Sequence, residues 1–281
     1  DLANLSDVAM ESALSCGAMD QIMDMVTDTS DPLLQMSSLD LLEVMASCRP
    51  MHGNRARYLF SKPVLGPLLQ MAGGGIDGDE QSEPDPILVG TALRLLSSLF
   101  RIGQRDASLF GVDGNADVLL SGFKNALYYF DAETSENGSL AFIDAVSSLA
   151  SSSPNALSMV LDDPYLREGW LSLSSIAQPK LKSVVLNSVA QVIDPPVEKD
   201  ANGDSIPPCN LPSNQMAMRL YEKLGEVNSM NSTDMLLSLA RAPIVETRLG
   251  SYDLMRAVAK RGTVAQVLLS HSDFYEFLIN Q

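Results

Sequence analysis

The sequence predicts an all-α protein, and more narrowly a right-handed α-solenoid built from irregular helical repeats. Apolar residues recur at the three- and four-residue spacing of an amphipathic helix through most of the 281 residues. A long, a short and a medium helix then recur in that order along the chain, which is typical of stacked repeats. Runs of alternating β-branched residues, the usual mark of strands, do not occur in the sequence.

The clearest repeat is the last one, Pro243 to Gln281. We expect its long helix to open at Pro243 and to stop at Gly262, because apolar positions recur at helical spacing between them. A short apolar helix over 263–270 follows, and then a turn in which Ser272 or Asp273 can cap the closing helix.

The same order is predicted upstream. Long helices are expected from near positions 31, 85 and 139, and a further one from 178. Four of the long helices should carry proline at the first helical position, where its missing N–H costs nothing, at Pro32, Pro86, Pro179 and Pro243. A glycine or proline after a long helix predicts its end, at Gly53, Gly103, Pro154 and Gly262.

Residues 1–281 are interpreted as one α-solenoid domain of about five repeats that touch only their neighbours. Two inserts, the Gly-rich acidic 73–85 and the Pro-rich polar 194–212, are expected to be flexible loops, and 131–139 is a third loop. Neither end has the polar cap that terminal repeats need, so the chain is expected to be a fragment of a longer array.

The formal net charge of −16 argues against partners that are nucleic acids or anionic membranes, since both require a basic surface. The remaining readings are a protein partner with basic patches, or an acidic surface that only aids solubility. No apolar run reaches the roughly 18 residues that span a bilayer, and no signal peptide is visible. Three cysteines without metal-ligand spacing favour a reducing cytoplasmic location, with the nucleus as the second candidate.

Two motifs that suggest ligand binding are interpreted as loops. Gly73–Gly78 fits the G-x-G-x-x-G pattern, but it follows a helix where a dinucleotide site needs a strand, and acidic residues surround it. Asp200–Asp204 has the spacing of the first EF-hand ligands, but Ser205 stands where glycine is required and Leu211 where the bidentate glutamate belongs. No cofactor and no metal is therefore expected.

No catalytic constellation is expected either, and the chain is predicted not to be an enzyme. His52 and His271 are interpreted as turn residues, and Asp162 and Asp163 as helix-end carboxylates that cap the next helix. Trp170 is expected in or near the core.

The repeats, with P-x-x-L followed by A-L-x-x-L-x-x-L-A and then G-x-x-x-x-x-L-F, resemble the armadillo repeat, a relative of the HEAT repeat. In that family the long third helices line a concave groove. The positions that hold Trp and Asn in its peptide-binding members fall here on Asp40, Val44, Arg94, Ser98, Asp144, Ser148, Asn187, Gln191, Asp253 and Ala257. The Trp–Asn ladder itself is missing, so an extended basic nuclear-import peptide is not the expected ligand.

A closer resemblance is to the 26S proteasome non-ATPase regulatory subunit 5 family, armadillo/HEAT-like chaperones of proteasome assembly. It is strongest over residues 243–281, with support from LARAPIVE at 239–246 and SLDLLEVMAS at 38–47. The resemblance implies a non-enzymatic, monomeric chaperone that holds the C-terminal domain of one AAA+ ATPase subunit of the proteasome base on its concave face. The alternative is a generic armadillo scaffold or adaptor for another cytosolic protein.

Partner contacts are expected from polar side chains on the long helices. The set comprises Asp40, Arg94, Ser98, Asp144, Ser148, Asn187, Gln191, Arg248, Asp253 and Arg256. The last long helix and its approach are also locally basic, with Arg241, Arg248, Arg256, Lys260 and Arg261. Part of this basic cluster complements the helix dipole, and the rest is a candidate contact for an acidic patch on a partner.

Overall fold

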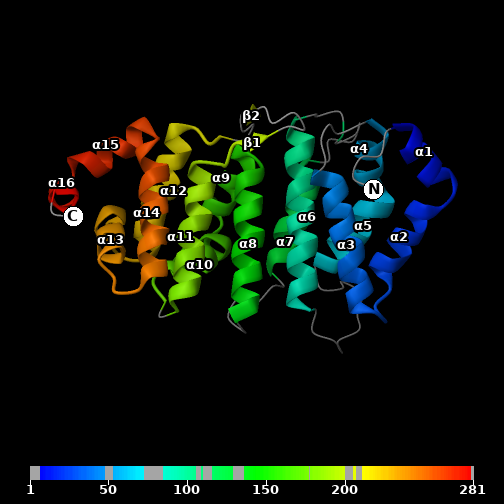
Figure 1. Cartoon of the computed structure of the whole chain (residues 1–281), viewed down its shortest axis with the longest axis horizontal. Helices are drawn as coiled ribbons and strands as arrows, with labels where there is room; N and C mark the ends of the chain where they lie inside the picture. Colours follow the sequence, from blue (N-terminus) through cyan, green and yellow to red (C-terminus); the bar gives the residue numbers. More distant parts are fainter. Residues whose placement is uncertain are drawn as a thin grey trace. The chain divides into compact units, whose positions relative to one another are not determined.

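The computed structural model describes residues 7–47, 53–72, 85–105, 109, 116–128, 136–176, 178–199, 205–206 and 211–279. These residues are almost entirely helical (Figure 1), so the predicted all-α class is confirmed. None of the described helices is both long enough and apolar enough to cross a membrane.

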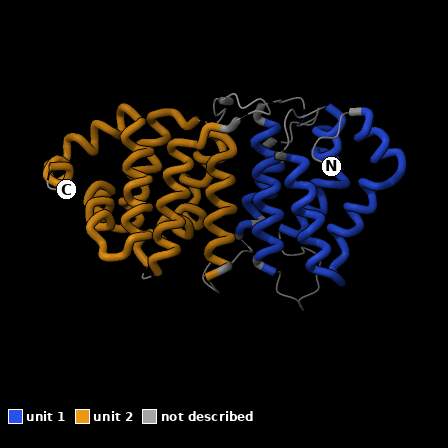
Figure 2. The backbone as a smooth tube through the Cα atoms, in the orientation of Figure 1, with its two compact units in different colours: residues 1–131, 198–207 blue, residues 132–197, 208–281 orange. Residues whose placement is uncertain are grey.

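The chain divides into two compact units (Figure 2), of which one comprises residues 1–131 and 198–207, and the other residues 132–197 and 208–281. Each unit contains stacked helices and is described by itself. The interpretation of residues 1–281 as one domain stays a prediction.

The first unit contains seven described helices and a short hairpin. Its elements are α1 (Asp7–Ser15), α2 (Ala18–Thr27), α3 (Pro32–Ser47), α4 (Gly53–Leu59), α5 (Lys62–Ala72), α6 (Pro86–Arg105), α7 (Ala116–Tyr128), β1 (Glu198–Lys199) and β2 (Ser205–Ile206). The long helices α3 and α6 pack against each other, and the shorter α2 and α5 cover one side of them. This is the predicted alternation of long and shorter helices.

The second unit stacks three long helices side by side, in the order α8, α11, α14 (Figure 1). Its elements are α8 (Glu136–Ser152), α9 (Pro154–Asp162), α10 (Pro164–Leu171), the 3₁₀ turn η3 (Ser172–Ser174), α11 (Pro179–Ile193), α12 (Asn214–Val227), α13 (Ser232–Ala240), α14 (Val245–Ala259), α15 (Gly262–Ser270) and α16 (Ser272–Ile279). The long, short and medium order of α14, α15 and α16 agrees with the prediction for the last repeat. Of all described pairs, α11 and α14 share the most extensive contact.

Side chains that cap helix starts explain several boundaries. Asp31 accepts a hydrogen bond from the Leu34 N–H at 3.0 Å, just before Pro32 opens α3. Asp163 accepts from the Leu166 N–H at 3.1 Å and caps α10, which confirms the structural role predicted for it. Each such bond satisfies one of the N–H groups that a helix start leaves without an intrahelical partner.

The core of the second unit is built around Trp170, which has no exposed surface and confirms the predicted core position. Its indole Nε1–H donates to the Ser188 hydroxyl of α11 at 2.8 Å, so the one polar group of the ring is satisfied inside the core. Trp170 lies on α10, and this bond therefore fixes α10 against the long helix that forms part of the site below.

Three predicted boundaries are wrong. Helix α6 continues through Gly103 to Arg105, and α8 begins at Glu136, three residues before the predicted start. Pro243 lies outside α14, which begins at Val245 with Ile244 as its cap residue. The insert 194–212 also contains the antiparallel pair β1–β2, which no sequence pattern indicated.

Several predicted loops and turns lie outside the described residues. They include 73–84 with its G-x-G-x-x-G motif, 131–135, 200–204 with its partial EF-hand spacing, and the turn that holds His52. The last turn is described: His271 lies between α15 and α16, as expected.

Candidate functional site

The polar residues predicted to contact a partner lie on five long helices, in both units. Asp40 is on α3, Arg94 and Ser98 are on α6, Asp144 and Ser148 on α8, Asn187 and Gln191 on α11, and Arg248, Asp253 and Arg256 on α14. All ten side chains are exposed or half-buried. Exposure of this kind is compatible with contact to a partner, and that contact stays a prediction.

In the first unit, Arg94 contacts a neighbouring long helix. Its guanidinium donates to Glu43 Oε2 of α3 through Nε at 3.1 Å and through Nη2 at 2.7 Å. This two-point ion pair joins α6 to α3 and leaves the arginine 39% exposed. The sequence pattern did not identify Glu43 as its partner.

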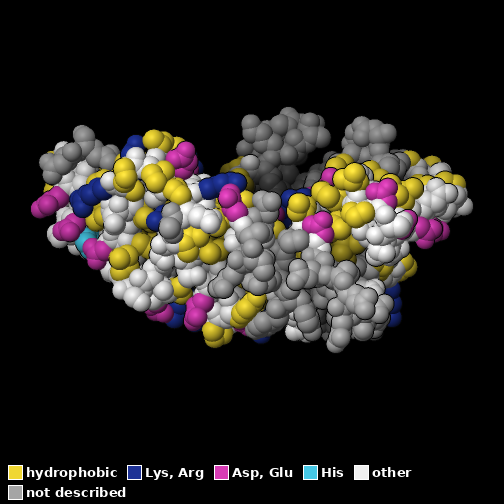
Figure 3. Space-filling model, turned by 90° about the horizontal axis from the view of Figure 1, so that it is seen from below, with side chains coloured by type: hydrophobic (Ala, Val, Ile, Leu, Met, Phe, Trp, Pro, Cys, Tyr) yellow, Lys and Arg dark blue, Asp and Glu magenta, His cyan; other side chains and the backbone are white. Residues whose placement is uncertain are grey.

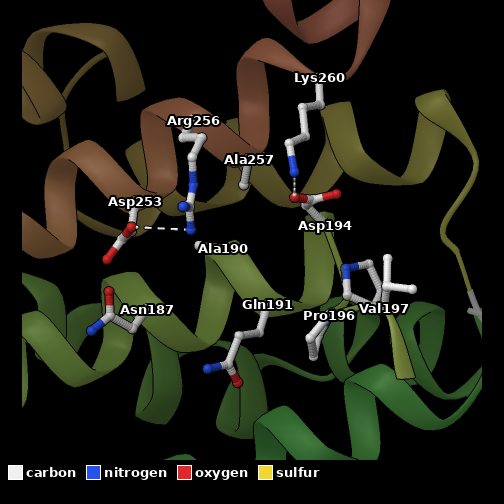
Figure 4. Close-up of a pocket in the computed structure, with 11 residues that line it drawn as sticks. Asn187, Ala190, Gln191, Asp194, Pro196, Val197, Asp253, Arg256, Ala257 and Lys260 are labelled. Carbon is white, nitrogen blue, oxygen red and sulfur yellow. Dashed lines mark hydrogen bonds and ion pairs between the residues drawn. The ribbon is translucent and has the colours of Figure 1, made fainter. Parts of the chain in front are cut away.

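In the second unit, four of the predicted residues line one open cleft of about 430 Å³ between α11 and α14 (Figure 4). These four are Asn187 and Gln191 from α11 and Asp253 and Arg256 from α14. The cleft is completed by Ala190, Asp194, Pro195, Pro196, Val197, Ala257 and Lys260. Asn187 and Asp253 occupy equivalent positions in successive repeats, which is why adjacent long helices bring them together.

Small residues allow α11 and α14 to approach closely beside the cleft. A Cβ atom on Gly250 would lie 3.2 Å from the Ser183 Cα atom, so only glycine fits there without a shift. Ala190 and Ala257 line the cleft, and their small side chains leave space in it. At the end of α11, the chain continues through Pro195 and Pro196, which both line the cleft. Figure 4 shows Pro196 beside Val197.

Two ion pairs balance the charges of the cleft. Lys260 Nζ lies 2.5 Å from Asp194 Oδ2, and Arg256 Nη2 lies 3.2 Å from Asp253 Oδ1. The Arg256 side chain is 71% exposed, which makes its pair with Asp253 the more solvated and the weaker of the two. The cleft therefore presents exchangeable charges of both signs to a ligand.

One acceptor in the cleft is buried and has no hydrogen-bond donor, namely the amide oxygen of Asn187. Buried polar atoms in folded proteins are almost always hydrogen-bonded, and an exception asks for an explanation. In Figure 4 this oxygen points toward the side chain of Asp253.

The basic cluster predicted on the last long helix is largely engaged within the chain. Arg248 Nη1 donates to the carbonyls of Ala242 and Pro243 at 2.9 and 3.0 Å, and Arg261 Nε donates to the Ile193 carbonyl at 2.8 Å. Burial lowers the pKa of Arg261 from its usual value, whereas nearby Asp194 raises it.

Arg241 lies over the Phe277 ring, 5.7 Å from its centroid. On the face shown in Figure 3, basic side chains of the described residues are scattered among acidic and hydrophobic ones. Of the predicted basic cluster, Arg256 has a side chain that is 71% exposed, and its contact with an acidic patch on a partner stays a prediction.

Sequence reasoning missed part of the cleft. Asp194 to Val197 were assigned to a flexible insert, yet these four residues are described and line the cleft. The Asp-Pro-Pro sequence directly after a helix was the available signal, because prolines fix the direction in which the chain leaves the helix. Lys260 was noted only as a charge that complements the helix dipole.

A second open cleft of about 450 Å³ lies between α12 and the start of α15. Its lining includes Arg219, which already pairs with Asp162 of α9. None of the residues predicted to contact a partner lines this cleft.

Elsewhere in the second unit, Asp234, His271 and Asp273 place one potential metal-ligating atom each within 4.8 Å of one another. His271 Nε2 lies 3.2 Å from Asp234 Oδ1. Both carboxylates occupy first turns of helices, α13 and α16, where a negative charge is stabilised by the helix dipole. Stabilisation by the helix dipoles explains why Asp234 and Asp273 occupy these positions, and no metal ion is needed to account for them.

The residues that line the α11–α14 cleft suit binding. The eleven of them, all described, include no histidine, serine or cysteine, and their four charged groups are paired with each other. Such a surface offers hydrogen bonds, charge and small apolar patches to a ligand.

The sequence matches no protein-family profile and no curated protein sequence. Among solved structures, a designed armadillo repeat protein in complex with the peptide (KR)4 is similar with a TM-score of 0.52 and 13% identity, over 91% of this chain and 88% of that one. An engineered protein and a second designed armadillo repeat protein each give a TM-score of 0.49 at 12% identity, over 91% and 92% of this chain and 85% and 86% of theirs.

The first of these similarities confirms the predicted fold class, an armadillo-like α-solenoid. At this identity the likeness concerns the fold alone. The relation to the proteasome subunit 5 family stays a resemblance.

Proposed function

We propose that this chain is a protein-binding scaffold, and that the surface of α11 and α14 around their shared cleft is its principal contact. One observation carries the proposal: Asn187, Gln191, Asp253 and Arg256, selected from the repeat pattern, line the same open cleft. Stacked helical repeats fix such side chains by packing, so the surface is preformed and binding a partner costs little ordering.

The finer proposal follows from the resemblance to the proteasome subunit 5 family. The partner is then the C-terminal domain of one AAA+ ATPase subunit of the proteasome base, and the scaffold acts as a non-enzymatic assembly chaperone. A folded domain of this kind buries about 800 Å² of each partner in a standard interface, far more than one cleft supplies. Exposed polar residues on the neighbouring long helices, such as Asp144 on α8, would extend the contact.

Isothermal titration calorimetry against the purified C-terminal domains of the proteasomal ATPase subunits tests this proposal. We expect one domain to bind the chain, and the double variant Asn187→Ala/Gln191→Ala to weaken that binding by about tenfold, equivalent to about 1.4 kcal/mol. Gln266→Ala is the matched control, because Gln266 is an exposed amide on α15 that does not line the cleft.

A pull-down separates the two levels of the proposal. Recovery of proteasomal ATPases without the mature core particle favours the assembly chaperone. If no ATPase domain binds, the chaperone assignment is wrong, and a scaffold for another cytosolic protein remains. If a domain binds equally well to the double variant and to the parent chain, the α11–α14 surface is not the contact.

A further inference from the structure

We infer that the exposed side of α14 pairs with the same helix of a second copy of this chain, so that two chains form an antiparallel, two-fold dimer. The inference goes beyond the proposed function, because it concerns a different side of α14 from the one that faces α11. It also differs from the monomer that the family resemblance implies.

Large hydrophobic side chains that are more than half exposed gather on α14, α15 and α16, the last three helices of the second unit (Figure 1). They are Val245, Leu249, Leu269, Tyr275, Leu278 and Ile279. The rings of Tyr252 and Phe277, with centroids 6.4 Å apart, place α16 beside α14. Single exposed hydrophobic residues are normal on a protein surface, whereas a group of them indicates an interaction site.

On α14 the exposed residues form one stripe along the helix. Val245, Leu249 and Tyr252 follow one another at spacings of four and three residues, so they share one face. Arg256 continues that face four residues later. The stripe is turned away from Gly250, which packs against α11. Among the described residues, α11 is the one long helix packed extensively against α14, so no long helix covers the stripe.

A second helix is the occupant that fits such a stripe. Within this unit, α11 is covered by α8 on one side and by α14 on the other. Hydrophobic residues that repeat at three- and four-residue spacing are those that pack against another helix. A helix–helix contact is therefore expected, and the charges beside the stripe decide which helix supplies it.

The charges on α14 favour a second copy of the same helix that runs in the opposite direction. Glu246 lies in the first turn of α14 and Arg256 in its last turn, about 15 Å apart along the helix axis. In an antiparallel pair centred on Leu249 and Tyr252, Glu246 of each chain lies beside Arg256 of the other. Opposite ends of the two helix dipoles also meet. A parallel copy would bring Glu246 beside Glu246 and would gain neither interaction.

Arg256 can take part because its ion pair within the chain is weak. Its Nη2 lies 3.2 Å from Asp253 Oδ1, and the arginine side chain is 71% exposed. Exposed pairs of this kind contribute little to stability. A guanidinium has five N–H donors, so Arg256 can contact Asp253 and the Glu246 carboxylate of a second chain at the same time.

Sedimentation velocity of the whole chain over a range of concentrations tests the inference. We expect a reversible change from one chain to two as the concentration rises. No larger species should form, because a two-fold contact uses the same surface of both chains and closes on itself.

One pair of variants tests the hydrophobic stripe. Leu249→Asp places a charge at the centre of the contact and should weaken the dimer by at least about tenfold. Leu33→Asp is the matched control, because Leu33 is an exposed leucine on α3 in the other unit, and its dimer should be as stable as that of the parent chain. A thermal melt of each variant verifies that it is folded.

A charge exchange tests the antiparallel direction. Glu246→Arg and Arg256→Glu each bring like charges together and should weaken the dimer several-fold, most strongly at low salt. The double variant restores opposite charges across the contact and should recover the dimer. Two residues that acted separately would not produce this recovery.

The inference is overturned if the chain sediments as a single molecule into the high micromolar range, if Leu249→Asp dimerises as the parent chain does, or if the double variant stays as weak as either single change. A chain that remains single while Leu249→Asp loses an ATPase domain also overturns it, and assigns the stripe to that partner. Its failure is distinguishable from failure of the proposed function, because dimer formation needs no other protein and Leu249 does not line the α11–α14 cleft.

Discussion

Gly250 of α14 faces the backbone of Ser183 on α11 so closely that a single methyl group on Gly250 would meet the Ser183 Cα and carbonyl oxygen at 3.2 Å. These are backbone atoms, which cannot rotate out of the way as the end of a side chain can. The contact therefore sets the distance between the two helices that form the cleft. It is a packing requirement that helical periodicity does not reveal.

The variant Gly250→Ala should destabilise the second unit. Relieving the contact requires α14 to move away from α11, and overpacking of this kind costs about 1–3 kcal/mol. Urea unfolding followed by fluorescence measures it, since Trp170 is the only tryptophan of the chain and lies in this unit. Gly262→Ala is the control, because nothing lies within 4 Å of a Cβ atom placed on Gly262. The free energy of unfolding of this variant should stay within about 0.5 kcal/mol of that of the parent chain.

The variant Ser188→Ala tests the polar bond in the core. Ser188 accepts from the Trp170 indole at 2.8 Å, and without it the buried N–H has no partner among the contacts described. We expect a loss of about 1–3 kcal/mol in the free energy of unfolding and a shift in the Trp170 emission. Ser147→Ala, which removes a more exposed hydroxyl on α8, should cost far less. Equal losses in the two variants would show that the indole bond contributes nothing.

Much of the fold is predictable from sequence because helix starts depend on local chemistry. Pro32, Pro86 and Pro179 open long helices because proline has no N–H to leave unpaired and its φ is already helical. Pro243 fails the same rule, since α14 begins two residues later at Val245. A proline therefore indicates a helix start nearby but does not determine its first residue.

Gly103 shows the limit of glycine as a stop signal. It is buried inside α6, where the surrounding helix packing outweighs its low intrinsic helix propensity of about 1 kcal/mol relative to alanine. Tertiary contacts of this kind are not visible in a local pattern. For the same reason the sequence missed the first residues of α8, a segment that it assigned to a loop.

The sequence predicts on which helices the residues of the candidate site lie. It does not predict which groups of the chain each of these residues contacts. Asn187 and Asp253 were selected by repeat register, and that register brings them to one cleft. The composition does not show which arginines remain available to a partner. Arg248, for example, donates to the Ala242 and Pro243 carbonyls within the chain. Counting charges therefore does not show which basic side chains of α14 are engaged within the chain.

Charge reversal separates the two arginines of α14 that were predicted to act alike. Arg248→Glu should lower the melting temperature by several degrees, because it removes two hydrogen bonds to backbone carbonyls and adds a charge that repels them. Arg256→Glu should leave the melting temperature nearly unchanged, since its side chain is 71% exposed. Differential scanning calorimetry compares them. Equal destabilisation by the two changes would contradict the different roles that the contacts give them.

The stability of the second unit should fall at alkaline pH because of Tyr221. Burial raises the pKa of this phenol from 10.0 to about 12, the hydrogen bond with Thr233 opposes the rise, and Asp234 adds to it. The folded state therefore disfavours the ionised form, so the stability is fully present below pH 10 and is lost as the pH rises toward 12. One such group contributes a slope of about 1.4 kcal/mol per pH unit in that window.

Urea unfolding at several alkaline pH values, followed by Trp170 fluorescence, measures this slope. Tyr221→Phe should flatten it, at the cost of the 2.9 Å hydrogen bond to Thr233. Tyr275→Phe is the control, because that side chain is 63% exposed. If the parent chain and Tyr221→Phe lose stability in parallel between pH 10 and 12, the Tyr221 hydroxyl ionises as readily in the folded state as in the unfolded chain.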